Sequence, residues 1–533
     1  MRAMDCPPRR VLLRNGSIYC ADSPNATAMF TVGERIAWVG PEVAAPVHAD
    51  SVDSVVELGG RLVTPGFVDA HVHLALTGLA LVSLDLSGAA SLAEALQHLE
   101  AYADATPGPV LFGHGWDETD WPEGRTPTAA DLDAVVGNRV TYLSRVDAHS
   151  AVVSSALLAE DESIAALDGW RGHGLVERDA HHAVRAVTSR LWSPEDRSTA
   201  LLRALRFAAS RGITSVHELN APHISPFDDF AALRALSSNQ PLPEVVPYWG
   251  ELCGGEADDP TLVGYAGDLC ADGAIGSRTA CLHEPYADAD TAGFLYLSSS
   301  DASAHVVHCT QRGLQAGFHV IGERAVDEVT EGLRRAATVV GTKAMISARH
   351  RLEHVEMPTP QAISTLAELG VVASVQPAFD AEWGGLERLY ARRLGARRAA
   401  AMNPFASMHA AGVMLAFGSD SPVTPLDPWS GVRAAVFHSN AAERLPAAAA
   451  FDAATRGGHR ARRRDDAGVL TAGAEATYAV WDAGTCAGAP AGDGNGAGTG
   501  EAHLPDLAPG RALPRCAQTV VAGTTIFSAE DDR

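Results

Sequence analysis

Strand-like apolar runs alternate with helix-like segments through most of this chain, and this alternation is the feature that most restricts its fold. After residue 73 the strand-like runs cover residues 109–112, 140–143, 212–216, 314–320, 351–354, 371–375 and 413–417. Helical spacing of apolar residues occupies intervening segments, including 89–103, 197–210, 325–339 and 360–369. Because strands that alternate with helices form parallel βα units, about eight such units predict an α/β fold, the (β/α)₈ TIM barrel.

The two ends of the chain have a different pattern. Short strand-like runs separated by turn residues occupy residues 11–63, and similar runs return at 468–473, 476–481 and 519–522. We therefore predict a small β-unit assembled from residues 1–64 and 465–533, with the barrel over residues 65–464. Residues 483–510 are rich in Gly, Ala and Pro, which predicts a mobile surface loop.

Composition argues against two kinds of partner. The chain has 65 acidic and 41 basic side chains, and its net charge of −24 would repel nucleic-acid phosphates. No apolar run approaches the ~18 residues that a membrane-spanning helix needs. The 8 cysteines are scattered, which favours reduced thiols. We expect a cytoplasmic protein with no nucleic-acid and no membrane partner.

Two histidines end the first apolar run of the expected barrel, Thr64-Pro-Gly-Phe-Val-Asp-Ala-His71-Val-His73. In an extended strand, residues two apart point to the same face, so both imidazoles would be directed at one point beyond the strand. Such a pair can coordinate a metal ion, although two histidines in solvent or in the protein core would show the same sequence pattern.

Three further polar residues also stand at the ends of strand-like runs: His319, His354 and Asp420. The carboxyl ends of parallel barrel strands meet at the mouth where active sites lie. Each residue alone could be a capping or core polar group. Together with His71 and His73, they predict a shared metal site.

The chain resembles the amidohydrolase superfamily, in the amidohydrolase-3 branch that includes N-substituted formamide deformylases. The matching segments are residues 64–73, 272–280, 319–325, 351–354, 374–377, 418–423 and 454–458. The resemblance implies a metal-bearing (β/α)₈ barrel with a composite β-sandwich built from both termini. It also implies that the metal site consists of His71, His73, His319, His354 and Asp420.

One position departs from the family pattern, which has a lysine four residues before the Asp272-Gly motif that is carboxylated to bridge two metal ions. Asp268 stands there, and Lys343, the only lysine, is not at a strand end. Either Asp268 forms a shorter bridge between two ions, or the site holds one ion. The short aspartate favours one divalent ion, expected to be zinc, because the barrel would have to narrow for Asp268 to reach both sides.

The resemblance implies hydrolysis of a non-peptide carbon–nitrogen bond in an amide, N-formyl or cyclic amide compound. A metal-activated water would attack the carbonyl carbon, with Asp420 as general base and acid. His354 or His319, where it is not a ligand, would polarise the carbonyl oxygen. Ester or lactone cleavage, deamination and a metal-poor binding protein are the alternatives.

Substrate contacts are expected from segments that resemble the family's substrate mouth. We assign substrate binding to His149, Arg278 and Trp116, with a small molecule as the substrate. Trp121, Phe379 and Trp383 are further candidates for an apolar pocket. For the oligomeric state, a homodimer is the assembly that we expect.

Overall fold

The computed structural model describes residues 8–45, 52–255, 257, 259–483 and 504–530. Of the loop expected over residues 483–510, residues 484–503 lie outside the described residues. Within the described ranges, every helix is too short or too polar to cross a bilayer. The cysteines in these ranges are free thiols: Cys20, Cys253, Cys270, Cys281, Cys309 and Cys516.

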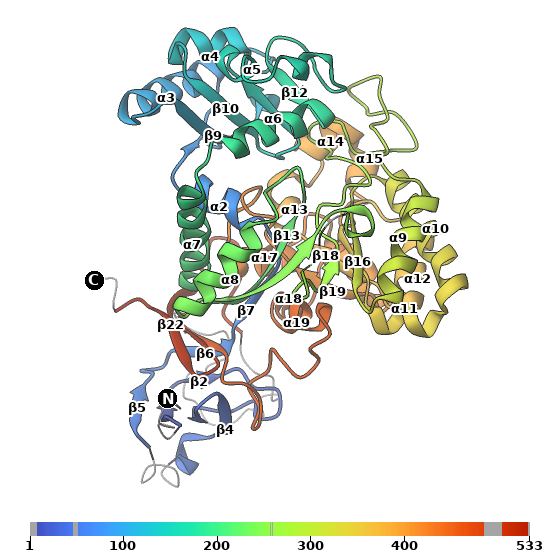
Figure 1. The fold of residues 1–533 in the computed structure, drawn as a ribbon. Helices are drawn as coiled ribbons and strands as arrows, with labels where there is room; N and C mark the ends of the chain where they lie inside the picture. Colours follow the sequence, from blue (N-terminus) through green and yellow to red (C-terminus); the bar gives the residue numbers. More distant parts are fainter. Residues whose placement is uncertain (1–7, 46–51, 256, 258, 484–503, 531–533) are drawn as a thin grey trace.

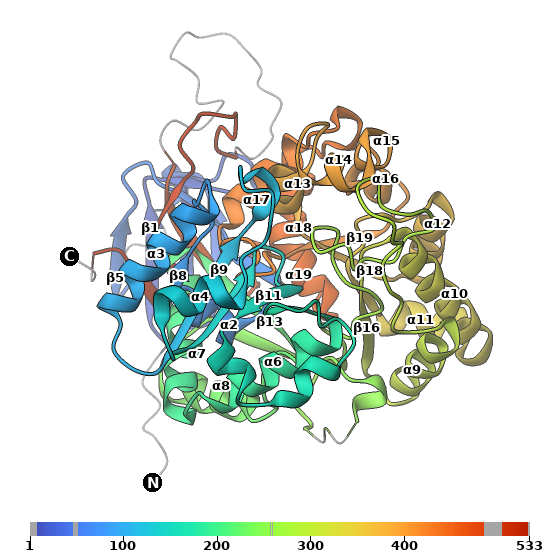
Figure 2. The ribbon, with the colours of Figure 1, turned by 90° about the horizontal axis from the view of Figure 1, so that it is seen from above.

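Eight parallel strands form the central sheet, which curls into a nearly closed barrel (Figures 1 and 2). In spatial order they are β7 (Phe67–Val72), β13 (Ile213–Asn220), β14 (Glu244–Trp249), β15 (Gly264–Tyr265), β16 (Gln315–Val320), β17 (Arg351–His354), β18 (Val372–Val375) and β19 (Met414–Phe417). The first and last strands meet beyond their carboxyl ends, where Asp420 N donates to His71 O at 2.8 Å. The α/β barrel predicted from the sequence is confirmed.

Helices cover the outside of the barrel, and Figure 1 shows α9 to α12 packed along one side. Because helices lie on the outer face and side chains fill the interior, all 6 residues of β7 and all 8 of β13 are buried. The helices of this part are α2 (Leu74–Ala80), α7 (Pro194–Ser210), α8 (Asp229–Asn239), η4 (Leu252–Gly254), α9 (Ser299–Gln311), α10 (Glu323–Val340), α11 (Thr342–Ala348), α12 (Pro360–Leu369), α13 (Pro377–Trp383), α14 (Leu389–Leu394), α15 (Ala396–Ala399), α16 (Phe405–Ala410), α17 (Pro428–Val436), η5 (Ala441–Glu443), α18 (Ala447–Ala454) and α19 (Arg456–Ala461).

Local signals explain why the expected helices form where they do. Helix α12 begins after Thr359, whose hydroxyl accepts from Ala362 N at 3.2 Å, and has Pro360 at its first position. It ends at Gly370, whose φ of +64° suits a residue without a side chain. These signals are all visible in the sequence.

A second sheet, inserted between β7 and β13, was not anticipated from the sequence. Its strands are β8 (Leu84–Asp85), β9 (Val110–Trp116), β10 (Val140–Arg145), β11 (Ser150–Val153) and β12 (Leu175–Glu177). Its helices are α3 (Leu92–Ala105), η2 (Glu118–Asp120), α4 (Ala129–Val136), α5 (Ser155–Leu158), η3 (Glu162–Ala166) and α6 (Arg178–Arg190). Two runs expected in the barrel, 109–112 and 140–143, belong here, because β9 and β10 pair with each other instead of with barrel strands. Figure 1 shows this unit above the barrel mouth, with α6 on the side that faces the mouth.

Both ends of the chain build two small sheets on the opposite side of the barrel (Figure 1). One contains β1 (Arg10–Arg14), β3 (Ala28–Val32), β4 (Arg35–Gly40) and β5 (Ser54–Glu57), with η1 (Glu42–Ala44) after β4. The other contains β2 (Ser17–Ile18), β6 (Leu62–Pro65), β20 (Tyr478–Asp482), β21 (Arg515–Val521) and β22 (Thr524–Ser528). Leu13 and Val63 share one buried cluster with Val480 and Val520, so the expected composite unit from both termini is confirmed.

Trp481 links this terminal unit to the barrel. Its indole N–H donates to Thr64 Oγ1 at 2.9 Å, and its ring packs against Phe67 and Trp429. We expect Trp481→Ala to destabilise the fold by about 3–5 kcal/mol, because it removes a buried aromatic side chain and leaves a cavity. The measurement is the midpoint of thermal unfolding, with the smaller change Trp481→Phe as the control. An unchanged midpoint in Trp481→Ala would show that the two units do not depend on this contact.

Candidate metal centre

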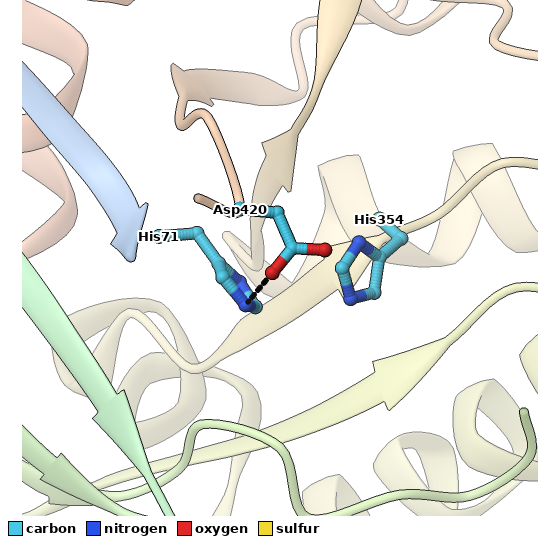
Figure 3. A group of neighbouring side chains, drawn as sticks. All are labelled: His71, His354 and Asp420. Atoms are coloured by element: carbon cyan, nitrogen blue, oxygen red, sulfur yellow. Dashed lines mark ion pairs between the residues drawn. The ribbon is translucent and has the colours of Figure 1, made fainter. Parts of the chain in front are cut away.

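Six side chains from the barrel strands and the loops that follow them converge at the mouth. His71 lies in β7 and His73 directly after it; His319 lies in β16, His354 ends β17, and Asp268 and Asp420 follow β15 and β19. All are buried except Asp268, whose side chain is 13% exposed. Figure 3 shows Asp420 between His71 and His354, with its ion pair to His71.

Backbone conformation at two of these positions is unusual. His354 and Asp420 adopt φ values of +70° and +54°, a region that residues with a Cβ rarely occupy. Such a conformation costs on the order of 1–3 kcal/mol and persists only where the surroundings enforce it. Both residues lie at a strand end, where this turn of the backbone directs the side chain to the centre of the mouth.

The nitrogen and oxygen atoms of this group have spacings that suit a shared ion. His73 Nε2 lies 3.1 Å from Asp420 Oδ1 and 3.2 Å from Asp268 Oδ2. His71 Nε2 lies 3.2 Å from Asp420 Oδ1 and 3.5 Å from Asp268 Oδ1. Two ligands about 2.1 Å from one tetrahedral ion lie about 3.4 Å apart, so these separations fit first-row divalent metals such as zinc.

Asp268 also reaches the other half of the group. Its Oδ1 lies 3.7 Å from His319 Nδ1, and it forms a compact donor set with His319 and His354. The residue before it is a glycine in an unusual conformation: Gly267 has a φ of +108°, and a Cβ there would lie 3.2 Å from Asn220 O of β13. The chain after β15 thus passes close to the end of β13, and Asp268 lies within reach of both groups of histidines.

Hydrogen bonds on the outer sides of three rings determine which nitrogen faces the centre. His71 Nδ1 donates to Glu353 Oε2 at 2.9 Å, His319 Nε2 to Gly273 O at 3.3 Å, and His354 Nδ1 to Gln376 Oε1 at 2.8 Å. The opposite nitrogens are then lone-pair donors in the neutral ring. Each of these inward nitrogens, like Asp268 Oδ1, is buried and forms no hydrogen bond. This donor set fits a metal ion.

The outer hydrogen bonds of His319 and His354 also concern the carbonyl-polarising role that was expected for one of these residues. A neutral imidazole polarises a carbonyl oxygen by donating N–H to it. The tautomers described above leave no proton on His319 Nδ1 or His354 Nε2. In this arrangement both rings act as electron-pair donors toward the centre.

The electrostatics of the group favour a bound cation. Burial lowers the pKa of His73, but the carboxylates of Asp268 and Asp420 outweigh burial and raise this pKa to about 9. Burial acts against the charged form of Asp268, yet His73, His319 and His71 hold its pKa well below the ordinary value. The two carboxylates therefore draw positive charge inward, and a metal ion supplies it while the imidazoles stay neutral.

Gln376 offers a test of the outer hydrogen bonds. We expect Gln376→Leu to lower metal affinity by roughly 10- to 100-fold, because His354 loses the acceptor that orients its ring. Competition with a chromophoric chelator measures this affinity. Gln376→Glu keeps an acceptor and should bind metal at least as well as the unmodified protein. Equal affinity of Gln376→Leu and the unmodified protein would contradict the proposed orientation of His354.

Of the residues expected to bind substrate, the structure brings only His149 to the centre. Its ring lies 5.0 Å from that of His319 and lines both cavities that contain the metal-site residues. Trp116 is buried in the core of the inserted sheet, where its indole N–H donates to Leu143 O at 2.8 Å. Arg278 binds Asp288 through two nitrogens, at 2.7 and 3.0 Å, and does not line either cavity. Of the aromatic candidates, Phe379 and Trp383 line one cavity, while Trp121 packs near Trp116.

A buried charge cluster holds His149 in place. Arg145, 3% exposed, contacts Asp117 at 2.7 Å, Glu118 at 2.9 Å and Asp147 at 3.0 Å. Asp147 also accepts from His149 N at 3.2 Å. The inserted unit therefore supplies the His149 side chain to a site whose candidate metal ligands come from the barrel.

Sequence reasoning missed the residues that orient the ligands, Glu353 and Gln376. Glu353 directly precedes His354 in the Arg351-Leu-Glu-His run. It also forms an ion pair with Arg351 inside the barrel. Gln376 directly follows β18. Its position at a strand end was the available signal, but a single amide at a strand end is also common in a protein core and does not by itself indicate a role at a metal site.

A parallel barrel with these donors at the carboxyl ends of its strands defines a class, the (β/α)₈ proteins with a metal site at the mouth. Within that class, the chain belongs to the amidohydrolase family, whose sequence model matches residues 54–527.

Known relatives extend over most of the chain. It is 28% identical over 462 residues to Protein LONG AFTER FAR-RED 3 of Arabidopsis thaliana, covering 80% of this chain and 77% of that protein. It is 24% identical over 524 residues to N-substituted formamide deformylase of Arthrobacter pascens, covering 89% and 93%. An uncharacterized metal-dependent hydrolase of Pyrococcus horikoshii superposes with a TM-score of 0.70 at 25% identity, covering 89% of this chain and 97% of that one.

Proposed function

We propose that this protein is a metal-dependent hydrolase that cleaves a non-peptide carbon–nitrogen bond in a small molecule, such as an amide, N-formyl or cyclic amide compound. One observation carries the proposal: three buried imidazoles, with their outer N–H groups hydrogen-bonded, direct free lone pairs at the same centre that the Asp268 and Asp420 carboxylates face. The similarity to N-substituted formamide deformylase over 93% of that protein supports the bond type.

The donors suffice for two divalent ions, with zinc as the expected metal. His71, His73 and Asp268 form one set, and Asp268, His319 and His354 form another. We propose that Asp268 is shared between them. When bound, the metal supplies an acidified water and an electrophile for the carbonyl oxygen.

Asp420 is the proposed proton carrier. Burial acts against its charged form, but His71, His73 and His354 lower its pKa, so the carboxylate is ionised at neutral pH. It takes a proton from the attacking water as the new C–O bond forms. It then gives that proton to the leaving nitrogen as the C–N bond breaks.

A hydrolysis screen tests the function. N-formyl, amide, cyclic amide and ester compounds are offered to metal-loaded and to chelator-treated protein, with metal content measured in parallel. We expect turnover of at least one C–N compound that disappears on chelation and returns with metal. Ester cleavage alone would favour an esterase or lactonase, and far less than one metal equivalent without turnover would favour a binding protein.

A further inference from the structure

Two cavities meet beside helix α6 at the mouth of the barrel. One contains metal-site residues together with His182 and His223. The other is largely apolar, and its residues include Leu79, Phe112 and Trp192. Its volume is about 700 Å³, part of which is open to solvent. Leu76, Ala148, Arg185 and Pro422 line both cavities, so the two spaces adjoin.

Along helix α6, the residues that face these cavities change from charged and polar near the metal-site residues to less polar farther away. His182 and Arg185 line the cavity that contains the metal-site residues, while Arg185 and Thr188 line the apolar one. These positions follow the three- and four-residue spacing of one helix face. A ligand that extends from the metal centre along α6 would therefore meet charge first and apolar surface afterwards.

Arg185 lies at the junction with its charge uncompensated. It donates to Ala148 O at 2.8 Å, but no carboxylate of the described residues lies within 4.0 Å of it. Other arginines near the site are paired: Arg145 with three carboxylates and Arg278 with Asp288. Arg197, which also lines the apolar cavity, lies 3.4 Å from Asp229.

Asp147, Asp268 and Asp420 line the same cavity, but Asp147 is paired with Arg145, and Asp268 and Asp420 contact the metal-site histidines. The imidazoles nearest Arg185 do not supply a counter-ion. Burial, with a contribution from the arginine itself, lowers the pKa of His182 to about 4. Burial likewise lowers the pKa of His223 well below its ordinary value. These rings are neutral near pH 7, and a neutral imidazole can donate a hydrogen bond to an anion.

We propose that Arg185 binds a carboxylate carried by the substrate, so that the enzyme prefers anionic amides with a bulky apolar group. Arginine remains charged at any working pH, and its planar donors match a carboxylate. The scissile bond would then lie at Asp420, the carboxylate at Arg185, and the apolar group against Phe112 and Trp192. This inference rests on the proposed hydrolase function and specifies its substrate class.

Matched substrates test the proposal. We compare kcat/KM for N-formylphenylalanine and for its neutral carboxamide, using the unmodified protein, Arg185→Gln, Arg185→Lys and the control Arg190→Gln, an exposed arginine on the same helix. We expect Arg185→Gln to lower kcat/KM for the anionic compound by about 30-fold, mainly through KM, and to leave the neutral compound within threefold. Arg185→Lys should recover part of the loss. An equal loss with both compounds, or no preference for the anion in the unmodified protein, would overturn the proposal.

Binding separates this proposal from the hydrolase proposal. If neither compound is hydrolysed, calorimetry with 3-phenylpropionate and 3-phenylpropanamide still reports on Arg185. We expect Arg185→Gln to weaken the carboxylate by about 30-fold and leave the amide unchanged. Unchanged carboxylate binding would place the anion elsewhere, for example on the metal, and would overturn the assignment to Arg185.

Discussion

Asp420→Asn is expected to lower kcat by roughly 10³-fold while most of the bound metal is retained. Asparagine keeps the size of the side chain and one oxygen, so the donor set around His71 and His73 remains nearly complete. It cannot accept a proton from water at neutral pH, and the other carboxylate near both rings, that of Asp268, is assigned here to metal binding. Steady-state kinetics on a compound identified by the screen, with metal content by mass spectrometry, measure both quantities.

Asp290→Asn is the matched control for this experiment. Asp290 is exposed, and the same substitution there should leave kcat within twofold. A fully active Asp420→Asn variant would rule out Asp420 as the proton carrier. Loss of most of the metal from Asp420→Asn would instead make its main role that of a ligand.

Asp268→Ala is expected to remove at least one metal equivalent per chain. It should also reduce kcat/KM by more than the roughly 10- to 100-fold that is typical when a residue hydrogen-bonded to a metal ligand is changed. The reason is that Asp268 belongs to both donor sets, so its loss leaves each set one ligand short. Equilibrium dialysis followed by metal analysis gives the stoichiometry before and after the change.

Asp268→Glu provides the comparison, because it keeps the carboxylate and adds one methylene. Recovery of metal in Asp268→Glu and not in Asp268→Ala would assign the effect to the carboxylate. A single equivalent in the unmodified protein, retained in Asp268→Ala, would contradict the shared role and leave one ion on the remaining donors.

The inserted sheet gives the barrel a second source of functional groups. It brings His149 from the loop after β10, and His182 and Arg185 from α6, to the mouth where the metal-site residues of the barrel lie. Barrel strands and the residues directly after them carry the candidate metal ligands, whereas the inserted unit lines the space beyond them. Changes in the insert should therefore alter substrate preference more readily than metal binding.

The local sequence pattern was enough to predict the barrel fold and most of the candidate metal ligands. Alternating runs identified the parallel barrel, and the two-residue spacing of His71 and His73 placed both rings at one strand end. The same positional rule led to His319, His354 and Asp420, because the carboxyl ends of parallel strands share one rim. Such inferences succeed because periodicity and strand ends depend on residues that are close in the chain.

Tertiary structure alone decided the rest. Residues 109–112 and 140–143 have the pattern of barrel strands, but pairing between β9 and β10 places them in a separate sheet. Asp268 lies near His71 and His73 and also near His319 and His354, a position that depends on how β15 sits among the other barrel strands. Likewise Arg278 is neutralised by Asp288 while Arg185 has no carboxylate partner among the described residues. Strand partners, close backbone approaches and charge pairing arise between segments far apart in the chain, and local sequence carries no record of them.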